Sequence, residues 1–282
     1  MHDGREGVPL RTLRLTLEYA GARFAGWQIQ PDARTVQGEL ERALAELLRE
    51  PVRVVGASRT DAGVHATGQV ASFQTPSPLP CEKLLAGLNA LLPEDAAVSR
   101  VEEAPEGFHA RFSALGKHYR YRLLSRPARS PLHRGDAWHL PRALDLEAMR
   151  QAGALLVGRH DFRAFVSRPD GDGDCVRTLT RVDVSEAPLE VPGGGRLVLV
   201  DVVGESFLYK MVRTIVGTLA QVGRGTRPAG DLRALLASGD RRRAGPTAPA
   251  HGLTLVRVAY GPGELPGIEA RACSTLCGHS HP

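Results

Sequence analysis

Two kinds of hydrophobic spacing alternate along the chain, one typical of strands and one typical of helices. Residues 13–19 (LRLTLEY) carry apolar side chains at every second position, the pattern of a strand with one buried face. Thr35 is a suitable N-cap, and the apolar residues after it recur three or four positions apart: Val36, Leu40, Ala43, Leu44 and Leu47. The start of the chain therefore predicts a strand, a turn-rich segment and an amphipathic helix.

The same alternation continues to residue 260. In the first half the spacing predicts strands at 51–57, 68–74 and 96–104 and a helix at 81–91. In the second half, which begins near residue 113, it predicts strands at 117–124, 177–185, 196–203 and 253–260 and helices at 145–158, 206–223 and 229–237. Strands and helices mixed in this way predict an α+β fold. The two halves follow a similar order, although no sequence repeat is visible.

Length and composition indicate a globular protein. The chain has 282 residues, 42% of them hydrophobic, which suits one large domain or two moderate ones. No stretch approaches the ~20 apolar residues of a membrane span. The first ten residues lack the apolar core of a secretory signal. We therefore expect a cytoplasmic protein without a membrane partner.

The basic residues favour a nucleic-acid partner. The net charge is +5, and the only lysines are Lys83, Lys117 and Lys210, so the other cations are arginines. A guanidinium grips phosphate with two hydrogen bonds and stacks on bases. Richness in Arg, Ala and Gly also follows from GC-rich coding, so charge alone leaves the partner open.

The cysteines suggest a reducing compartment. Four cysteines are too few and too scattered for a disulfide framework. The last ten residues do contain four soft-metal ligands, Cys273, Cys277, His279 and His281. No apolar residues surround them, so we expect a frayed terminus without metal, and metal binding there stays open. Residues 168–174 form a Gly/Asp-rich loop that we expect to be mobile, and its role stays open.

Residues 56–66 (GASRTDAGVHA) carry the most informative motif. Arg59 precedes Asp61 by two positions, and Gly63 follows it by two, between two predicted strands. An isolated Asp-Ala-Gly triplet would indicate only a turn. The longer string strongly resembles the signature of the TruA family of tRNA pseudouridine synthases, G-R-T-D-A-G-V-H followed by a small residue. Ser58 replaces the first glycine of that signature, and the rest is intact.

Further motifs extend this resemblance over residues 11–260. They occur in the order and at the spacing that the family has: FAGWQIQ (24–30), FHARFSA (108–114), KHYRY (117–121), HDFRAF (160–165), MVRTIVG (211–217) and GLTLVRVAY (252–260). Several independent motifs in the right order make chance agreement very improbable. One departure is Lys210, where the family often has a histidine.

The resemblance implies a fold and an assembly. The fold is two related α+β domains, 11–112 with the catalytic loop and 113–262, whose antiparallel sheets join into one continuous sheet. Helices pack on one face, and the catalytic cleft lies between the domains. The termini 1–10 and 263–282 fall outside the resemblance, and we expect them to be flexible. The resemblance also implies a homodimer that acts on uridines 38, 39 and 40 of the tRNA anticodon arm.

The resemblance assigns roles to four residues. Asp61 is the nucleophile and Arg213 its charge partner. Arg59 helps to open the RNA helix, and Tyr119 stacks on the target uracil. The reaction moves the glycosidic bond from N1 to C5 without gain of atoms or redox change, so we expect no cofactor and no metal.

Other residues in the motifs receive structural roles. We expect Tyr121 and Trp27 to pack, and His65, His109 and His160 to make structural hydrogen bonds. Two alternative functions stay open. One is a tRNA-binding or RNA-folding protein without catalysis, and the other is a pseudouridine synthase with a different RNA target. The sequence also leaves open whether Asp61 attacks C6 of the base or C1′ of the sugar.

Overall fold

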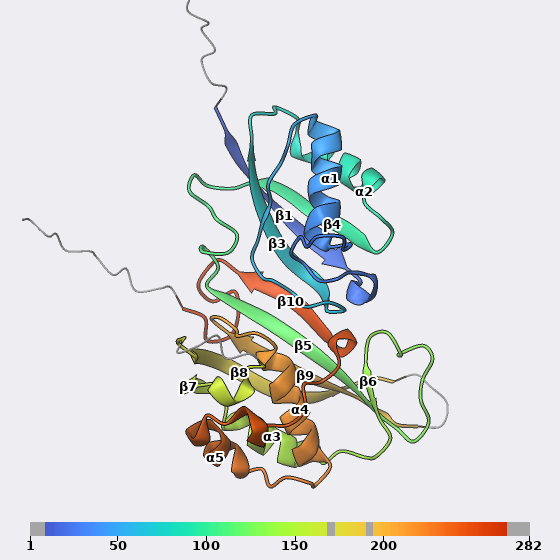
Figure 1. The fold of residues 1–282 in the computed structure, drawn as a ribbon, viewed down its shortest axis with the longest axis vertical. Helices are drawn as coiled ribbons and strands as arrows, with labels where there is room; N and C mark the ends of the chain where they lie inside the picture. The colour runs from blue at the N-terminus through green and yellow to red at the C-terminus, as the bar shows by residue number, and fades with distance from the viewer. Residues whose placement is uncertain (1–8, 168–172, 190–193, 270–282) are drawn as a thin grey trace, which may run out of the picture.

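One sheet runs through the whole molecule (Figure 1). The computed structural model describes residues 9–167, 173–189 and 194–269. Its strands are β1 Arg11–Tyr19, β2 Val55–Gly56, β3 His65–Thr75, β4 Ala96–Glu103, β5 Gly116–Ser125, β6 Trp138–Leu140, β7 Gly158–Asp161, β8 Val176–Ala187, β9 Arg196–Gly204 and β10 Leu253–Ala259. Its α-helices are α1 Val36–Leu48, α2 Cys81–Leu91, α3 Leu146–Ala154, α4 Met211–Gly223 and α5 Asp231–Ser238. The strand order is β4-β1-β3-β10-β5-β9-β8-β7, with β2 beside β3 and β6 beside β5.

The last strand joins the two halves of the chain. β10 pairs in parallel with β3, where Thr254 lies opposite His65, and antiparallel with β5 on its other side. All other neighbours in the main order are antiparallel where their register is given. This arrangement confirms the predicted α+β fold with one continuous, mostly antiparallel sheet. The boundary near residue 113 stays a prediction, because the sheet crosses it without a break.

The main hydrophobic core extends through both halves of the chain, and along β9 it lies on the face of Val198, Val200 and Val202. Leu13, Leu15 and Leu17 of β1 are fully buried, as the period-2 pattern predicts. α1 begins at the expected cap, where the Thr35 hydroxyl accepts a hydrogen bond from the Gly38 N–H.

A small second cluster lies on the opposite face, since its Val203 follows Val202 of the main core along β9. Leu265 and Ile268 are buried in this second cluster. The start of the predicted flexible C-terminus is therefore packed, while residues 270–282 lie outside the described residues.

Residues 51–57 form a strand only at Val55–Gly56, so this prediction was mostly wrong. The alternation of buried side chains is present, but Val54 hydrogen-bonds α1 instead of a neighbouring strand. Its N–H donates to the Glu41 carboxylate at 3.0 Å, and its carbonyl accepts from the Gln37 amide at 3.0 Å. Side chains of α1 thus take the hydrogen bonds of the Val54 backbone that a neighbouring strand would otherwise form.

Two predicted helices are shorter than their hydrophobic patterns. The helix expected at 206–223 begins at Met211, because Lys210 has a left-handed φ of 59° that a helix cannot contain. The helix expected at 145–158 ends at Ala154, and Gly158, with φ of 112°, starts β7. β6 and β7 were not predicted, because strands of three and four residues are too short to show a period.

Candidate active site

The loop between β2 and β3 packs against the 24–30 segment and is hydrogen-bonded to it. The Trp27 N–H donates to the Thr60 carbonyl at 3.0 Å, and the Tyr19 hydroxyl lies 2.8 Å from the Thr60 hydroxyl. Gly26 has φ of 106°, and a Cβ there would lie 2.8 Å from the Thr60 carbonyl oxygen. Only glycine lets the two segments approach so closely. This contact explains why the FAGWQIQ and RTDAGVH motifs occur together.

Asp61 projects from this loop to the first turn of α4. The Arg213 Nη1 donates to Asp61 Oδ2 at 2.8 Å, across 152 positions of sequence. Arg213 Nε donates to the Ala248 carbonyl at 2.8 Å, so the guanidinium is held on two sides. The side chains of Asp61 and Arg213 are 19% and 13% exposed. A charge-assisted bond in a partly dry site fixes the carboxylate and leaves its second oxygen available.

Tyr119 of β5 forms the floor of the site. Its hydroxyl is 2.7 Å from the Ser58 hydroxyl, and its ring meets Phe207 edge to face with centroids 5.0 Å apart. Burial raises the pKa of Tyr119 to about 12; the Ser58 hydrogen bond opposes this shift, and the charge of Asp61 adds to it. The phenol therefore stays neutral at physiological pH.

Tyr121 lies two positions further along β5 and is fully buried. Its hydroxyl donates to the Pro249 carbonyl at 2.7 Å. Gly252 packs against its ring so closely that a Cβ on that glycine would lie 2.5 Å from Tyr121 Cζ. These contacts fit the packing role expected for Tyr121.

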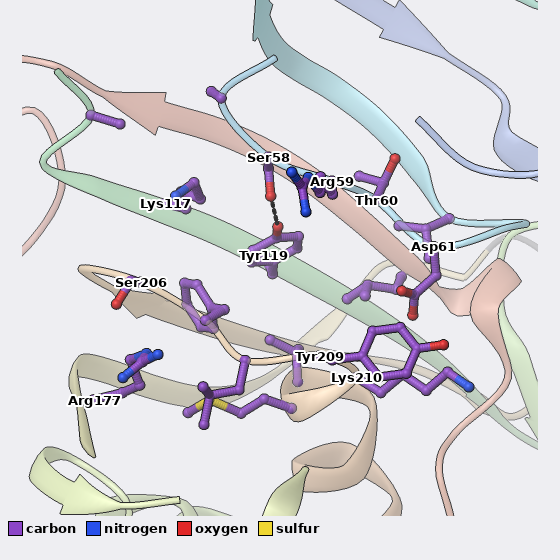
Figure 2. Close-up of a pocket in the computed structure, with 18 of the residues that line it drawn as sticks. Ser58, Arg59, Thr60, Asp61, Lys117, Tyr119, Arg177, Ser206, Tyr209 and Lys210 are labelled. Carbon is purple, nitrogen blue, oxygen red and sulfur yellow. Dashed lines mark hydrogen bonds between the residues drawn. The ribbon is translucent and has the colours of Figure 1, made fainter. Parts of the chain in front are cut away.

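The four predicted site residues, Arg59, Asp61, Tyr119 and Arg213, line one cleft of about 790 Å³. Its walls come from the 56–61 loop, from β5, and from the segment 205–213 that leads into α4 (Figure 2). The cations on its lining are Arg59, Arg111, Lys117, Arg177, Lys210 and Arg213, and the carboxylates are Asp61 and Glu205. Six positive charges against two negative ones make this a cleft that attracts polyanions.

Several lining residues were not predicted from the sequence. Phe112 is 67% exposed, and its ring stacks on His109 with centroids 4.3 Å apart. Phe207 lies on a segment that was expected to be helical, and Arg177 had no signal at all. Lys210, the departure from the family pattern, also lines the cleft, with its ammonium 4.8 Å from the centre of the Tyr209 ring.

The three histidines in the motifs bind the main chain. His65 accepts from the Gly21 N–H at 3.1 Å and faces the Gly135 carbonyl at 2.9 Å. His109 accepts from the Arg111 and Phe112 N–H groups, and His160 contacts the Val157 carbonyl. These bonds fit structural roles.

Within the described ranges, no cluster of three or more His, Cys, Asp or Glu side chains could hold a metal. The Cys273, Cys277, His279 and His281 group and most of the 168–174 loop lie outside those ranges. No helix in the same ranges is long and apolar enough to span a membrane.

Comparison with known proteins matches this chain to one family over most of its length. The model of a family described as tRNA pseudouridine synthase matches residues 16–113 and 152–261. The tRNA pseudouridine synthase A of Syntrophotalea carbinolica is 47% identical over 253 residues, which cover 90% of this chain and 98% of that protein. The proteins of the same name from Myxococcus xanthus and Geobacter sulfurreducens are 48% and 46% identical, over 88% and 89% of this chain and 91% and 100% of theirs.

Proposed function

The chain belongs to the tRNA pseudouridine synthase family, and we propose that it isomerises uridines 38, 39 and 40 of the tRNA anticodon arm, with Asp61 as nucleophile. The observation that carries the proposal is the Asp61–Arg213 ion pair, which presents a fixed carboxylate inside a basic cleft. A carboxylate with a held charge partner is equipped to form a covalent intermediate. The surrounding cations suit a substrate with a phosphate backbone.

The reaction conserves every atom of the substrate except one exchanged hydrogen. The bond from N1 of uracil to C1′ breaks, and a bond from C5 to C1′ forms. The hydrogen on C5 leaves as a proton, and N1 gains one. Asp61 attacks either C1′ of the sugar or C6 of the base, and both routes keep the uracil in the site while it turns.

The other site residues position the nucleotide. Tyr119 is neutral and held by Ser58 and Phe207, so its ring is a rigid surface for the uracil, with stacking that contributes ~1–3 kcal/mol. Arg59 lies in the same loop as Asp61 and fills the space that the extruded nucleotide leaves in the RNA stem. Arg213 keeps the carboxylate aimed into the cleft.

We infer three further properties of the protein from the same resemblance. It acts in the cytoplasm, it is a homodimer, and one tRNA contacts both subunits. Three neighbouring target positions require recognition of tRNA shape through phosphates more than through base edges. The high share of arginine among the cations supports this mode of binding.

Tritium release from tRNA that carries 5-tritiated uridine tests the activity. Wild type should release tritium, and Asp61→Ala and Asp61→Asn should release none. Asp183→Asn is the matched control, because Asp183 is an exposed carboxylate on β8 outside the cleft, and it should behave as wild type. Substrates with cytidine at 38, 39 or 40 in turn then map the target positions.

Two results would contradict the proposal. Tight tRNA binding without tritium release by wild type would leave a non-catalytic tRNA-binding protein. Release that persists when positions 38, 39 and 40 are all cytidine would leave a pseudouridine synthase with another target.

A further inference from the structure

The cleft continues well past the Asp61–Arg213 pair. Figure 2 shows Asp61 at one end and Lys117, Ser206 and Arg177 toward the other. Arg111 also lines this cleft. These four side chains, Arg111, Lys117, Arg177 and Ser206, are called the distal cluster below. The chemistry proposed above assigns no role to them.

Strand register explains why two members of the distal cluster face the same way. Lys117 of β5 and Leu179 of β8 both lie opposite Gly204 of β9, so their side chains share one face of the sheet. Arg177 is two positions from Leu179 and projects from that face too. A Cβ on Gly204 would lie 2.7 Å from Leu179 Cδ2 and from the Thr178 carbonyl oxygen. The glycine thus lets the chain pass close to β8 as it leaves β9 and brings Ser206 to the cluster.

Arg177 is held in place but only partly hydrogen-bonded. Its Nη1 donates to the carbonyls of Val176 and Asp174 at 2.6 and 3.0 Å. Its Nε is buried without an acceptor in the part of the chain that the structure describes. Its Nη2 makes no hydrogen bond to the described residues either. Native proteins rarely leave such groups unpaired, and an anion bound at this point would supply the missing acceptor.

The described residues compensate the charge of Arg177 poorly. The closest carboxylate oxygen among them belongs to Asp174, at 3.9 Å from Nη1, on a side chain that is 77% exposed. An exposed pair at that distance contributes little. Among the described residues, Glu205 is the one carboxylate that lines this part of the cleft beside three cations. The distal cluster therefore keeps a net positive charge.

We propose that the distal cluster binds one backbone phosphate of the tRNA. Its members offer N–H and O–H donors and three positive charges, and a phosphodiester matches them with acceptor oxygens and a negative charge. A guanidinium fixed by two carbonyls loses little freedom when it binds. This subsite rests on the function proposed above, and it acts in substrate binding, since Asp61 lies at the other end of the cleft.

Salt-dependent binding of full-length tRNA tests the subsite. Arg177→Gln should raise the Kd and the KM about tenfold and leave the rate of tritium release at saturating tRNA unchanged. The slope of log Kd against log salt should decrease by about 0.7 to 0.9, the contribution of one phosphate. Arg233→Gln is the matched control, since Arg233 is an exposed cation on α5 outside the cleft. It should match wild type in all three measurements.

Neutral phosphates locate the contact. A series of ligated tRNAs, each with one methylphosphonate in the anticodon arm, should include one position that weakens binding to wild type but not to Arg177→Gln. If thermal melting shows that Arg177→Gln does not fold, the same measurements are made on Lys117→Gln. Its binding should no longer be weakened by a methylphosphonate at the position that weakens binding to wild type.

The subsite is refuted if Arg177→Gln binds with the Kd and salt slope of Arg233→Gln. It is also refuted if the saturating rate falls while the Kd stays constant, because Arg177 would then act in the chemistry. Failure of the proposed function looks different: wild type would bind tRNA without tritium release, and the binding measurements would still decide on the distal cluster.

Discussion

At the scale of single residues, the site depends on side chains that are uninformative by themselves. Asp61 alone has the signature of a turn, and Arg213 alone would be taken for a surface cation. Together they form a 2.8 Å ion pair, and Arg213 is held in turn by the Ala248 carbonyl. Each contact restricts the next, so the carboxylate is presented in one orientation before any substrate arrives.

Loss of Arg213 should therefore reduce the rate of chemistry more than substrate binding. We expect Arg213→Gln to lower the saturating rate of tritium release by roughly 10²-fold or more, in the range found when one fixed donor is removed from an active site. The rate of Arg213→Lys should lie between those of wild type and Arg213→Gln. Lysine keeps the positive charge, but it cannot bind Asp61 and the Ala248 carbonyl through one planar guanidinium. Single-turnover release at saturating tRNA measures this effect. An unchanged rate with a raised KM would show that Arg213 only binds phosphate.

We expect His65 to make the free energy of unfolding depend on pH. Its Nδ1 accepts from the Gly21 N–H, so a neutral ring carries its proton on Nε2, toward the Gly135 carbonyl. Burial lowers the pKa of His65; the Gly135 and His251 main-chain contacts and the charge of Asp136 oppose this shift, while Arg122 adds to it. The unfolded chain thus takes up a proton at His65 at a higher pH than the folded protein does.

The stabilisation from neutral His65 is complete above the unfolded pKa of about 6.5 and is lost as the pH falls through the lower, folded pKa. We expect the free energy of unfolding to decrease below pH 6.5, by at most about 1.4 kcal/mol per pH unit from this residue. Denaturant unfolding between pH 8 and 5.5 measures the slope. His65→Gln should flatten it, and the surface control His160→Gln should not. Equal slopes in the two variants would exclude His65 as the cause.

At the scale of elements, α4 is placed by close packing of backbone on backbone. A Cβ on Gly217, in the middle of this helix, would lie 1.8 Å from the Pro246 carbonyl oxygen. The Thr218 hydroxyl accepts from the Gly245 N–H at 3.0 Å. The same segment then supplies the Ala248 carbonyl to Arg213. The position of the charge partner of Asp61 thus depends on one glycine a turn further along the helix.

Replacement of Gly217 should reverse the usual effect of alanine in a helix. Gly→Ala in a helix interior normally stabilises by ~1 kcal/mol. Gly87→Ala in α2 should stabilise in the same direction by less, because its Cβ would lie 2.7 Å from Leu47 Cδ1 and 2.9 Å from Cδ2, and this leucine side chain can turn away. Gly217→Ala meets backbone, so we expect lower stability and lower activity. Thermal unfolding and tritium release of the two variants test this pair, and a stabilised, fully active Gly217→Ala would contradict it.

At the scale of the whole molecule, β10 makes the two halves one structure. The strand comes from the end of the described chain but lies between β3 and β5 in the middle of the sheet. Leu255 of β10 is fully buried, within a core that extends from β1 to α5. The cleft lies where the halves meet, with Asp61 from one and Tyr119 and Arg213 from the other.

We therefore expect both halves to unfold in one cooperative transition. The two tryptophans report on one half each: Trp27 precedes α1, and Trp138 lies on β6. In the Trp138→Phe variant, fluorescence reports on Trp27 alone, and in Trp27→Phe it reports on Trp138 alone. In each variant the fluorescence should change at the same denaturant concentration as the circular dichroism. A half that melts separately would show independent domains and would refute the single transition.

The elements could be predicted where hydrophobic spacing and hydrogen bonding agree. α1 follows Thr35 and its apolar face as predicted, and β1 follows the alternation of its leucines. Residues 51–57 alternate as a strand does, but the side chains of Gln37 and Glu41 take the hydrogen bonds of Val54. Spacing records which side chains are buried and does not record which partner the backbone finds.

The sequence by itself determined the α+β class and most strand and helix positions, because burial periods are local properties. Its motifs also gave the family resemblance, from which the four proposed site residues and the pairing of Arg213 with Asp61 were expected. Only the tertiary structure shows the geometry of that pair and that β10 joins the halves. It alone showed that Arg177, which no local pattern marks, faces the same cleft. Contacts between positions more than a hundred residues apart depend on strand order and register, and a single sequence carries no local signal for either.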